Sequence, residues 1–309
     1  FGVGEKTLLM KILLLGGNGQ IGRELRHSLM SLGQIKSCGR DMADFRDLDG
    51  LQYIIRDYVP DVIVNAVAST AVDKAEHQKD KAYSVNYKAV SFLAKEAKRL
   101  DAWLIHYSSD YVFNGKKLGA YTEMDKANPL SVYGDSKLMG DKEIVKSNCK
   151  CIIFRTSWVY SVYGDNFIRT IRRLGKERKS IKVVSDQIGA PTSAKLIANI
   201  SALCLYRLFN DHKFTKKYSG IYNLSSTGKV SWHGLAKYVI KESKQMGDNF
   251  LVNCENIHPV KASEYQSIAT RPNNSLLNTR KICSVFGVYL PHWKVALNEA
   301  LKELYLQKV

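Results

Sequence analysis

The sequence predicts an α/β protein in which a doubly wound parallel sheet is followed by a smaller mixed α/β lobe. From residue 11 onward, short apolar runs rich in Ile, Leu and Val alternate with longer stretches of helical period, and this alternation is typical of parallel βαβ units. A glycine-rich turn directly follows the first apolar run. After about Gln187 the alternation weakens and loops become more frequent. We therefore expect two units, residues 10–186 and 187–309.

Five strands and four helices account for the first unit. The apolar runs are continuous, as expected of parallel strands that are covered on both faces. In the second unit, residues 194–208 have the pattern of a helix that could pack back on the main sheet. The predicted strands are 11–15, 35–38, 62–66, 103–107 and 151–156, and the predicted helices of the first unit are 20–32, 48–58, 82–100 and 129–147.

Composition places the chain among ordinary globular proteins. Of its 309 residues, 45% are hydrophobic and 24% are charged, which argues against both extended disorder and a membrane protein. A chain of this length buries an ample core without disulfides. Its six cysteines form no CxxC pair and have no histidine at a zinc-ligand spacing. We therefore expect free thiols, no bound metal and a cytoplasmic protein.

We take Met10 as the native start of the chain. The apolar run that begins at residue 8 is interrupted by Lys11 and is followed by glycines where a cleavage site should be. This pattern predicts a buried strand and not a signal peptide. Residues 1–9 are left out of the fold prediction for this reason.

The chain is strongly basic, with 46 Lys and Arg against 29 Asp and Glu and a formal net charge of +17. Such a charge favours anionic partners, nucleic acids among them. The basic residues, however, are scattered through helical stretches such as 88–99, 169–179 and 237–244, without a zinc-finger or RNP-like segment. That distribution is typical of solvated helix faces. We therefore expect neither a nucleic-acid nor a membrane partner, and a positive surface that attracts a dinucleotide and a diphosphate.

A glycine turn joins the first predicted strand to the first predicted helix, with the sequence Gly16-Gly17-Asn18-Gly19-Gln20-Ile21-Gly22. Gly16, Gly19 and Gly22 permit a tight turn, a close approach of the backbone to a pyrophosphate and close packing of helix on strand. The free N–H groups at the start of the helix can then bind phosphate. Elsewhere in a chain such glycines would form an ordinary loop, but this position predicts a Rossmann-type domain that binds a dinucleotide.

The segment after the second predicted strand favours NADPH over NADH. An acidic residue usually stands there and accepts hydrogen bonds from the ribose hydroxyls of NADH, whereas this chain has Gly39-Arg40-Asp41. The guanidinium of Arg40 can hold a 2′-phosphate, while the neighbouring Asp41 leaves NADH possible. Arg40 as a solvated loop residue is the alternative. Asp44, a little further on, is a candidate partner of the adenine.

Tyr133 and Lys137 are the candidate proton-transfer pair. Four residues apart, they lie on one face of the predicted helix 129–147, where we expect the Lys137 ammonium to lower the pKa of the phenol and to hold the nicotinamide ribose. A YxxxK pair alone often arises by chance. Ser109 strengthens the assignment of this pair, because Ser109 follows a strand that ends at the ligand-binding edge of the sheet. Its hydroxyl can orient a carbonyl, and an ordinary Ser/Asp turn is the alternative.

Several longer motifs are more specific than the glycine turn. They are Val64-Asn65-Ala66, Thr70-Ala71-Val72-Asp73-Lys74-Ala75-Glu76, Ser108-Ser109-Asp110-Tyr111-Val112-Phe113, Arg155-Thr156-Ser157-Trp158-Val159-Tyr160, Asp186-Gln187-Ile188-Gly189-Ala190-Pro191-Thr192 and Arg271-Pro272-Asn273-Asn274-Ser275. With them, the chain from Met10 almost to its end resembles the dTDP-4-dehydrorhamnose reductases of the extended short-chain dehydrogenase/reductase superfamily.

The resemblance implies NADPH-dependent reduction of the 4-keto group of dTDP-4-dehydro-6-deoxy-L-mannose (dTDP-6-deoxy-L-lyxo-4-hexulose) to dTDP-L-rhamnose, an activated sugar for bacterial surface polysaccharides such as the O-antigen of lipopolysaccharide. It implies Tyr133 as the proton donor, Lys137 as its partner and Ser109 as the hydroxyl that tunes the carbonyl. The implied cofactor contacts are Gly19, Gln20, Ile21, Asp44, Phe45, Ala68, Ser69, Thr70, Tyr107, Tyr133 and Lys137, and the implied sugar-nucleotide contacts are Ser109, Asp110 and Trp158, to which we add Arg271 and Asn273 from the last motif.

Two positions depart from the family pattern. Ser109 stands where many relatives carry threonine, and the exchange keeps the hydroxyl. Lys195 stands where some relatives use a carboxylate in a metal-bridged dimer, and a cation there would repel the metal. We therefore expect a monomer or a homodimer without that metal bridge.

Three other functions remain open. The first is reduction of a different dTDP-keto-deoxysugar, since sugar contacts distinguish such substrates poorly. The second is a non-catalytic NADP-binding regulatory subunit, against which the intact set Ser109, Tyr133 and Lys137 argues. The third, a basic nucleic-acid binder, predicts retention of DNA or RNA at low salt.

Overall fold

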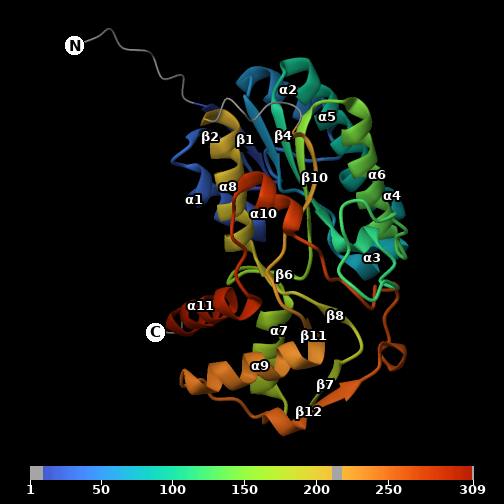
Figure 1. Cartoon of the computed structure of the whole chain (residues 1–309), viewed down its shortest axis with the longest axis vertical. Coiled ribbons are helices and arrows are strands. Elements are labelled where there is room, and N and C mark those ends of the chain that lie inside the picture. Colours follow the sequence, from blue (N-terminus) through green and yellow to red (C-terminus); the bar gives the residue numbers. More distant parts are fainter. Residues whose placement is uncertain (1–9, 211–217, 308–309) are drawn as a thin grey trace, which may run out of the picture.

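A six-stranded parallel sheet forms the centre of the upper half of the molecule (Figure 1). The computed structural model describes residues 10–210 and 218–307, so residues 1–9, set aside above, lie outside it. The strand order is β10-β5-β4-β3-β1-β2. It reverses between β1 and β3, and α/β folds bind ligands at such a switch point. The strands are β1 (Met10–Leu15), β2 (Gly33–Cys38), β3 (Val62–Asn65), β4 (Trp103–Ser109), β5 (Lys150–Thr156) and β10 (Gly220–Asn223).

Helices cover both faces of this sheet, which confirms the predicted doubly wound arrangement. Leu14, Val64 and Ile105 pack on one face against α1, α8 and α10, while Leu13 and Ile63 pack on the other face against α2, α5 and α6. Helix α8, which follows residue 187, packs on the first of these faces. These helices are α1 (Gln20–Leu29), α2 (Leu48–Tyr58), α5 (Ala89–Leu100), α6 (Val132–Ser147), α8 (Ala194–Asn210) and α10 (Arg280–Phe286).

The predicted helix 82–100 is in fact three consecutive segments. It consists of α4 (Lys79–Tyr83), a π-helical turn (Ser84–Lys88) and α5. The extra residue of a π-turn is often found at functional sites. In this chain the π-turn contains Asn86, whose Oδ1 accepts a hydrogen bond from the backbone N of Ser69 at 2.8 Å. The π-turn therefore fixes the segment that follows β3.

Helix α6 begins at Val132 and not near residue 129. Ser131 caps it, because its hydroxyl accepts a hydrogen bond from the backbone N of Gly134 at 3.2 Å. A second hydrogen bond runs from the backbone N of Val132 to the carboxylate of Glu76, at the end of α3 (Val72–His77), at 2.9 Å. Both bonds fix the first turn of α6, which carries Tyr133.

The lower half of the molecule has a separate hydrophobic core around Leu235, Val239 and Leu297. Helices α7, α9 and α11 surround it, together with short two-stranded sheets. Residues after 187 contribute to both halves, because α8, β10 and α10 belong to the upper one. The elements of the lower half are α7 (Phe167–Glu177), α9 (Trp232–Gln245) and α11 (Trp293–Leu306), with β6 (Val159–Tyr160), β7 (Ile181–Val184), β8 (Ile188–Gly189), β9 (Thr192–Ser193), β11 (Val230–Ser231) and β12 (Ile257–Val260).

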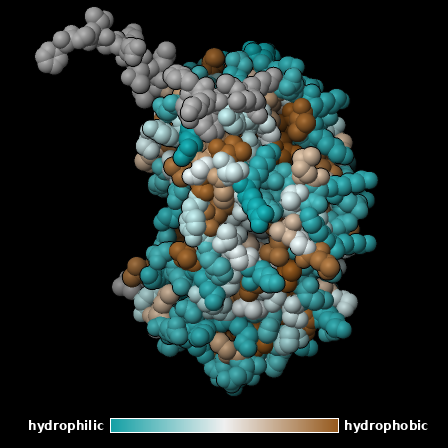
Figure 2. Space-filling model, in the orientation of Figure 1, coloured by the Kyte–Doolittle hydropathy of each residue, from teal (hydrophilic) through white to brown (hydrophobic). Residues whose placement is uncertain are grey.

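Hydrophilic side chains dominate the face of the molecule seen in Figure 2, where apolar ones gather in small separate groups. Within residues 10–210 and 218–307, no helix has both the length and the apolar character that crossing a membrane requires.

Candidate active site

The glycine turn has the conformation that its sequence predicts. Gly16 has a φ of +85°, which side-chain-bearing residues rarely adopt. The backbone N of Gly19 donates to the carbonyl O of Gly16 at 3.0 Å, and a Cβ on Gly22 would collide with that same oxygen. The turn therefore brings the start of α1 close to β1 and leaves the first N–H groups of the helix free to bind an anion.

A cavity of about 370 Å³, here called the turn cavity, lies beside the glycine turn and the end of β2. Asp44 accepts hydrogen bonds from the Arg46 side chain and backbone, and these bonds hold the pKa of its carboxyl well below the usual range. Arg40 is exposed at the same cavity. The predicted cofactor residues that line it are Gly16, Gly19, Arg40, Asp44, Phe45, Ala68, Ser69 and Thr70.

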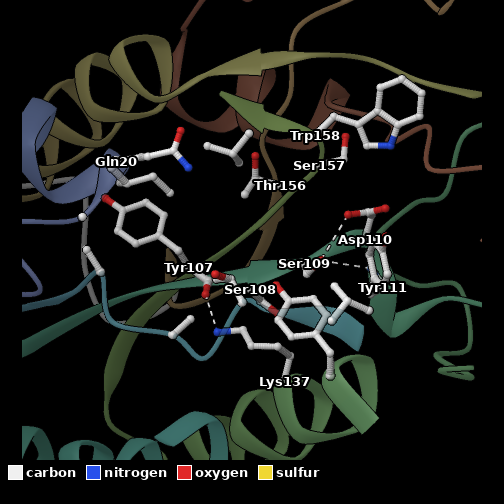
Figure 3. Close-up of a pocket in the computed structure, with 18 of the residues that line it drawn as sticks. Gln20, Tyr107, Ser108, Ser109, Asp110, Tyr111, Lys137, Thr156, Ser157 and Trp158 are labelled. Carbon is white, nitrogen blue, oxygen red and sulfur yellow. Dashed lines mark hydrogen bonds between the residues drawn. The ribbon is translucent and has the colours of Figure 1, made fainter. Parts of the chain in front are cut away.

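A second cavity, of about 410 Å³ and here called the central cavity, adjoins the turn cavity and shares Gly19, Ala68 and Thr70 with it. It lies at the carboxyl ends of β3, β4 and β5, on the ligand-binding side of the switch point. In Figure 3, Gln20 and Tyr107 lie at one end of it and Asp110 and Trp158 at the other. The predicted site residues that line it are Gly19, Gln20, Ile21, Ala68, Thr70, Tyr107, Ser109, Asp110, Tyr133, Lys137 and Trp158. Gly22 lines neither cavity and packs inside the turn.

Tyr133, Ser109 and Asp110 converge at the inner wall of the central cavity. Burial raises the pKa of Tyr133 to about 12, although a hydrogen bond with the Ser109 hydroxyl lowers it in part. The Ser109 hydroxyl donates to Asp110 Oδ1 at 3.1 Å. Burial also raises the pKa of Asp110 to about 7, against hydrogen bonds from Ser275 and Ser109. The phenol is thus protonated at neutral pH and can donate that proton to a bound carbonyl.

Lys137 is almost completely buried, at 1% exposure, beneath the same cavity. Its Nζ donates to the carbonyl O of Tyr107 at 2.6 Å and lies 3.1 Å from Nε2 of His106. Desolvation lowers the pKa of the amine to about 8, although the charge of Asp141 raises it. The expectation that Lys137 lowers the pKa of Tyr133 is wrong for this structure, because desolvation of the phenol outweighs any such effect.

Trp158 lines the central cavity but stacks on Trp232 of α9, with ring centroids 3.4 Å apart and planes at 9°. Trp232 belongs to a third cavity of about 600 Å³, here called the lower cavity. Arg271 and Asn273 line this lower cavity and are not among the residues that line the central one. Tyr111 lines both cavities and connects them.

Sequence reasoning missed several polar side chains of the central cavity. The hydroxyl of Thr156 is buried there and has no hydrogen-bond partner among the described residues, a situation that favours a polar ligand. Asn166, from the loop before α7, donates to Oε1 of Gln20 at 3.0 Å and so ties the lower half to the glycine turn. Thr156 lies in a motif quoted above and His106 in the predicted strand 103–107, but nothing in the sequence shows where their side chains point.

This chain is similar to known proteins over most of its length. The family model described as the RmlD substrate binding domain matches residues 10–306. The dTDP-4-dehydrorhamnose reductase of Burkholderia thailandensis is 40% identical over 298 residues, which cover 96% of this chain and all of that protein. The enzyme of that name from Escherichia coli K12 is 40% identical over 304 residues, 96% of this chain and 98% of that one.

Solved structures give the same result. The crystal structure of a dTDP-4-dehydrorhamnose reductase from Clostridium acetobutylicum superimposes with a TM-score of 0.85 at 32% identity, covering 96% of this chain and 100% of that one. The Bacillus anthracis enzyme, solved in complex with NADP, superimposes with a TM-score of 0.83 at 30% identity, covering 97% and 99%. By sequence and by structure, this chain belongs to the dTDP-4-dehydrorhamnose reductase family.

Proposed function

We propose that this chain uses NADPH to reduce the 4-keto group of dTDP-4-dehydro-6-deoxy-L-mannose to dTDP-L-rhamnose. The observation that carries this proposal is the convergence of Tyr133, Ser109 and Lys137 on one cavity that continues to the glycine turn. Family membership supplies the substrate, and the convergence supplies the groups that the reaction requires.

The two connected cavities fit a dinucleotide. Phosphates would lie on the free N–H groups at the start of α1, where Gly16 and Gly22 leave no side chain in the way. The turn cavity would take the adenosine, with the exposed Arg40 next to a 2′-phosphate. Arg40 favours NADPH and leaves NADH possible. Once bound, the reduced nicotinamide would supply the hydride for C4 of the sugar.

Tyr133 acts as the proton donor in this proposal. Its raised pKa, about 12, keeps the phenol protonated, and a sugar alkoxide is a far stronger base than a phenolate, so the proton moves to the sugar oxygen. The Ser109 hydroxyl orients the carbonyl and offers a hydrogen bond as negative charge develops on its oxygen. Lys137 positions the nicotinamide ribose from beneath the cavity.

The substrate side of the site would extend from the central cavity into the lower cavity. Asp110 and Trp158 are placed to contact the sugar, while Arg271 and Asn273 would contact the nucleotide part in the lower cavity. The charge of Arg271 suits a diphosphate. The product then serves bacterial surface polysaccharides. We also propose a cytoplasmic protein, since none of the six cysteines forms a disulfide in the described part of the chain. We propose in addition that it binds no nucleic acid and is a monomer or homodimer.

The experiment is an assay of nicotinamide oxidation with the dTDP-keto-sugar, run with NADPH and with NADH. Tyr133→Phe should lower turnover about 100-fold or more and leave NADPH affinity nearly unchanged, because only the proton donor is removed. Tyr206→Phe, at an exposed position on α8, is the matched control and should behave as wild type. Unchanged turnover in Tyr133→Phe would refute the role of Tyr133.

Two alternatives give different results in the same assay. A non-catalytic NADP-binding subunit would bind NADPH but show no sugar-dependent oxidation. A reductase of another dTDP-keto-deoxysugar would oxidise NADPH with that sugar and not with this one. The set Ser109, Tyr133 and Lys137 in one cavity favours an enzyme over the regulatory subunit.

A further inference from the structure

The hydroxyl of Thr156 is buried at the central cavity, and the reaction described above gives it no role. Thr156 is the last residue of β5 and lies beside Ser109, the last residue of β4, in the register of the sheet. The residue is 6% exposed, and its Oγ1 has no hydrogen-bond partner in the part of the chain that the structure describes. Native proteins rarely leave a buried hydroxyl in this state. A ligand of the central cavity is the partner that this hydroxyl lacks.

The polar side chains next to Thr156 along the same wall are already engaged. In Figure 3, Thr156 lies between Gln20 and Ser157. Oε1 of Gln20 accepts a hydrogen bond from Nδ2 of Asn166 at 3.0 Å, and the Ser157 hydroxyl donates to the carbonyl O of Ala190 at 3.5 Å. Of these three side chains, Thr156 is the one whose hydrogen bonds are all left for a ligand.

Three further polar side chains of the central cavity do not compete with Thr156 for the same part of a ligand. Thr70 and Asp165 are exposed, so water can satisfy them. Asp110 also has a buried oxygen without a partner, Oδ2, but Figure 3 places it at the other end of the cavity, near Trp158. The sugar is proposed to bind at that end, so Thr156 is left for the cofactor.

Thr156 is placed for the nicotinamide end of the proposed cofactor. With the phosphates on the start of α1 and the ribose at Lys137, the ring extends toward the ends of β4 and β5, where Ser109 and Tyr133 face the sugar carbonyl. Lys137 and Thr156 lie on opposite sides of the cavity in Figure 3. The ring carries a carboxamide on the carbon next to the one that donates hydride, and a buried carboxamide needs hydrogen-bond partners. A hydroxyl can donate to its oxygen or accept from its NH₂ group.

We propose that the Thr156 hydroxyl binds the carboxamide of the nicotinamide and thereby fixes the rotation of the ring in the central cavity. This inference rests on the proposed function, in which NADPH reduces the sugar. Rotation of the ring about its bond to the ribose exchanges its two faces, and only one face at a time can meet the sugar carbonyl. A hydrogen bond at one edge of the ring therefore holds the reacting face toward the sugar. Thr156 itself exchanges no proton or electron.

The test compares two ligands that differ only in the nicotinamide. NADPH carries the ring, whereas 2′-phospho-ADP-ribose has the adenosine, the phosphates and both riboses without it. Thr156→Val has nearly the shape of threonine but no hydroxyl. It should bind NADPH about tenfold more weakly, which corresponds to about 1.4 kcal/mol, and bind 2′-phospho-ADP-ribose as tightly as wild type. Isothermal titration measures both affinities.

Two results of this titration would overturn the proposal. Unchanged affinity for NADPH in Thr156→Val would mean that the hydroxyl does not bind the ring. An equal loss of affinity for both ligands would mean that Thr156 only supports the shape of the site. If Thr156→Val folds poorly, Thr156→Ala removes the same hydroxyl and allows the same comparison, because retained affinity for 2′-phospho-ADP-ribose reports an intact site.

Two further variants complete the comparison. Thr156→Ser keeps the hydroxyl and should retain most of the NADPH affinity, so a loss as large as that of Thr156→Val would contradict the proposal. Thr227→Val makes the same exchange at an exposed position in the lower half and is the matched control. It should leave both affinities unchanged.

The stability of the ligand-free protein separates a ligand-binding hydroxyl from a structural one. Because the Thr156 hydroxyl has no internal partner, replacing it with a methyl group should raise the urea midpoint of unfolding of Thr156→Val. A lower midpoint would show that the hydroxyl stabilises the fold, against the proposal.

Single-turnover kinetics at saturating NADPH test the rotation of the ring. Hydride transfer to the keto-sugar should slow about tenfold in Thr156→Val, because the ring spends less time in the reacting orientation. An unchanged rate would contradict the inference. The proposed function fails separately, if wild-type protein shows no sugar-dependent oxidation of NADPH, and that result does not alter the comparison of the two ligands.

Discussion

Asp73 and Arg271, 198 residues apart in the chain, form an ion pair in which Oδ2 and Nη2 are 2.6 Å apart. Asp73 lies in α3, which packs against α6, and its Oδ1 also accepts a hydrogen bond from the backbone N of Ala269 at 3.0 Å. The carboxylate therefore orients the segment that carries Arg271 along the wall of the lower cavity. The motif at residues 70–76 thus helps to position the motif at residues 271–275.

Asp73→Asn should weaken binding of dTDP. The amide keeps an acceptor for Ala269 but loses the charge that orients Arg271, so we expect about fivefold lower affinity, which corresponds to about 1 kcal/mol. Isothermal titration with dTDP measures it, and NADPH affinity should stay the same. Asp57→Asn removes an equal charge from the Lys36 pair on the surface and is the control. If dTDP binds Asp73→Asn as tightly as wild type, Arg271 does not contact the nucleotide.

Gly189→Ala should raise the KM for the keto-sugar about tenfold or more. A Cβ at Gly189 would lie 2.5 to 2.8 Å from three indole atoms of Trp158, so the indole must shift at the wall of the central cavity and away from its stack on Trp232. A loss of about 1.4 kcal/mol in the free energy of sugar binding corresponds to this tenfold change. Gly119→Ala, with nothing within 4 Å of the added methyl, is the control. Steady-state kinetics at saturating NADPH decide the matter, and an unchanged KM in Gly189→Ala would argue against Trp158 as a sugar contact.

Arg40→Gln should lower the preference for NADPH. The variant loses the charged partner of the 2′-phosphate, so NADPH should bind about tenfold more weakly while NADH binds as before. Fluorescence titration with each cofactor measures both affinities. Arg178→Gln, at an exposed position after α7, carries the same charge change far from the turn cavity. If both cofactors lost affinity equally, Arg40 would not be the residue that contacts the 2′-phosphate.

Most of the sheet could be predicted because its strands can be recognised one by one from their local sequence. Four of the six, β1, β3, β4 and β5, contain runs of adjacent apolar residues next to helical patterns. The signal of β2 is weaker, with Ile35 and Cys38 as its apolar residues, and the glycine turn marks the switch point. The sixth strand, β10 at Gly220–Asn223, has four residues without that signal, and its place beside β5 depends on tertiary packing. The π-turn around Asn86 was also missed, since a single extra residue in a helical pattern leaves the hydrophobic period almost unchanged.

The site was predictable only as far as its residues lie on predicted strand ends and helix starts. Ser109 and Tyr133 line the same cavity because, in this type of fold, the end of β4 lies close to the start of α6. The position of Arg271, in a neighbouring cavity, and the stacking of Trp158 on Trp232 depend on loops from the lower half. The direction of the Tyr133 pKa was mispredicted because a sequence gives charge but not desolvation.

Asp110 should make the stability of this protein depend on pH in an unusual direction. Its carboxyl is 3% exposed, and burial raises its pKa to about 7 in the folded state, against about 3.9 in an unfolded chain. Between these two values the folded state binds more protons than the unfolded state, so the free energy of unfolding falls as the pH rises. The loss begins near pH 4, is complete slightly above pH 7 and amounts to a few kcal/mol, on the order of 1.4 kcal/mol per unit.

Asp110→Asn isolates this contribution, because the amide does not titrate. Urea unfolding at about pH 5 and about pH 8 should show the variant gaining stability relative to wild type at the higher pH, by on the order of 2 to 3 kcal/mol. Asp101→Asn, whose carboxylate is largely exposed and pairs with Lys150, should keep a constant difference from wild type. If the Asp110→Asn difference is also constant, then Asp110 is ionised throughout this range, and the cavity wall beside Ser109 carries a negative charge that the bound sugar must accommodate.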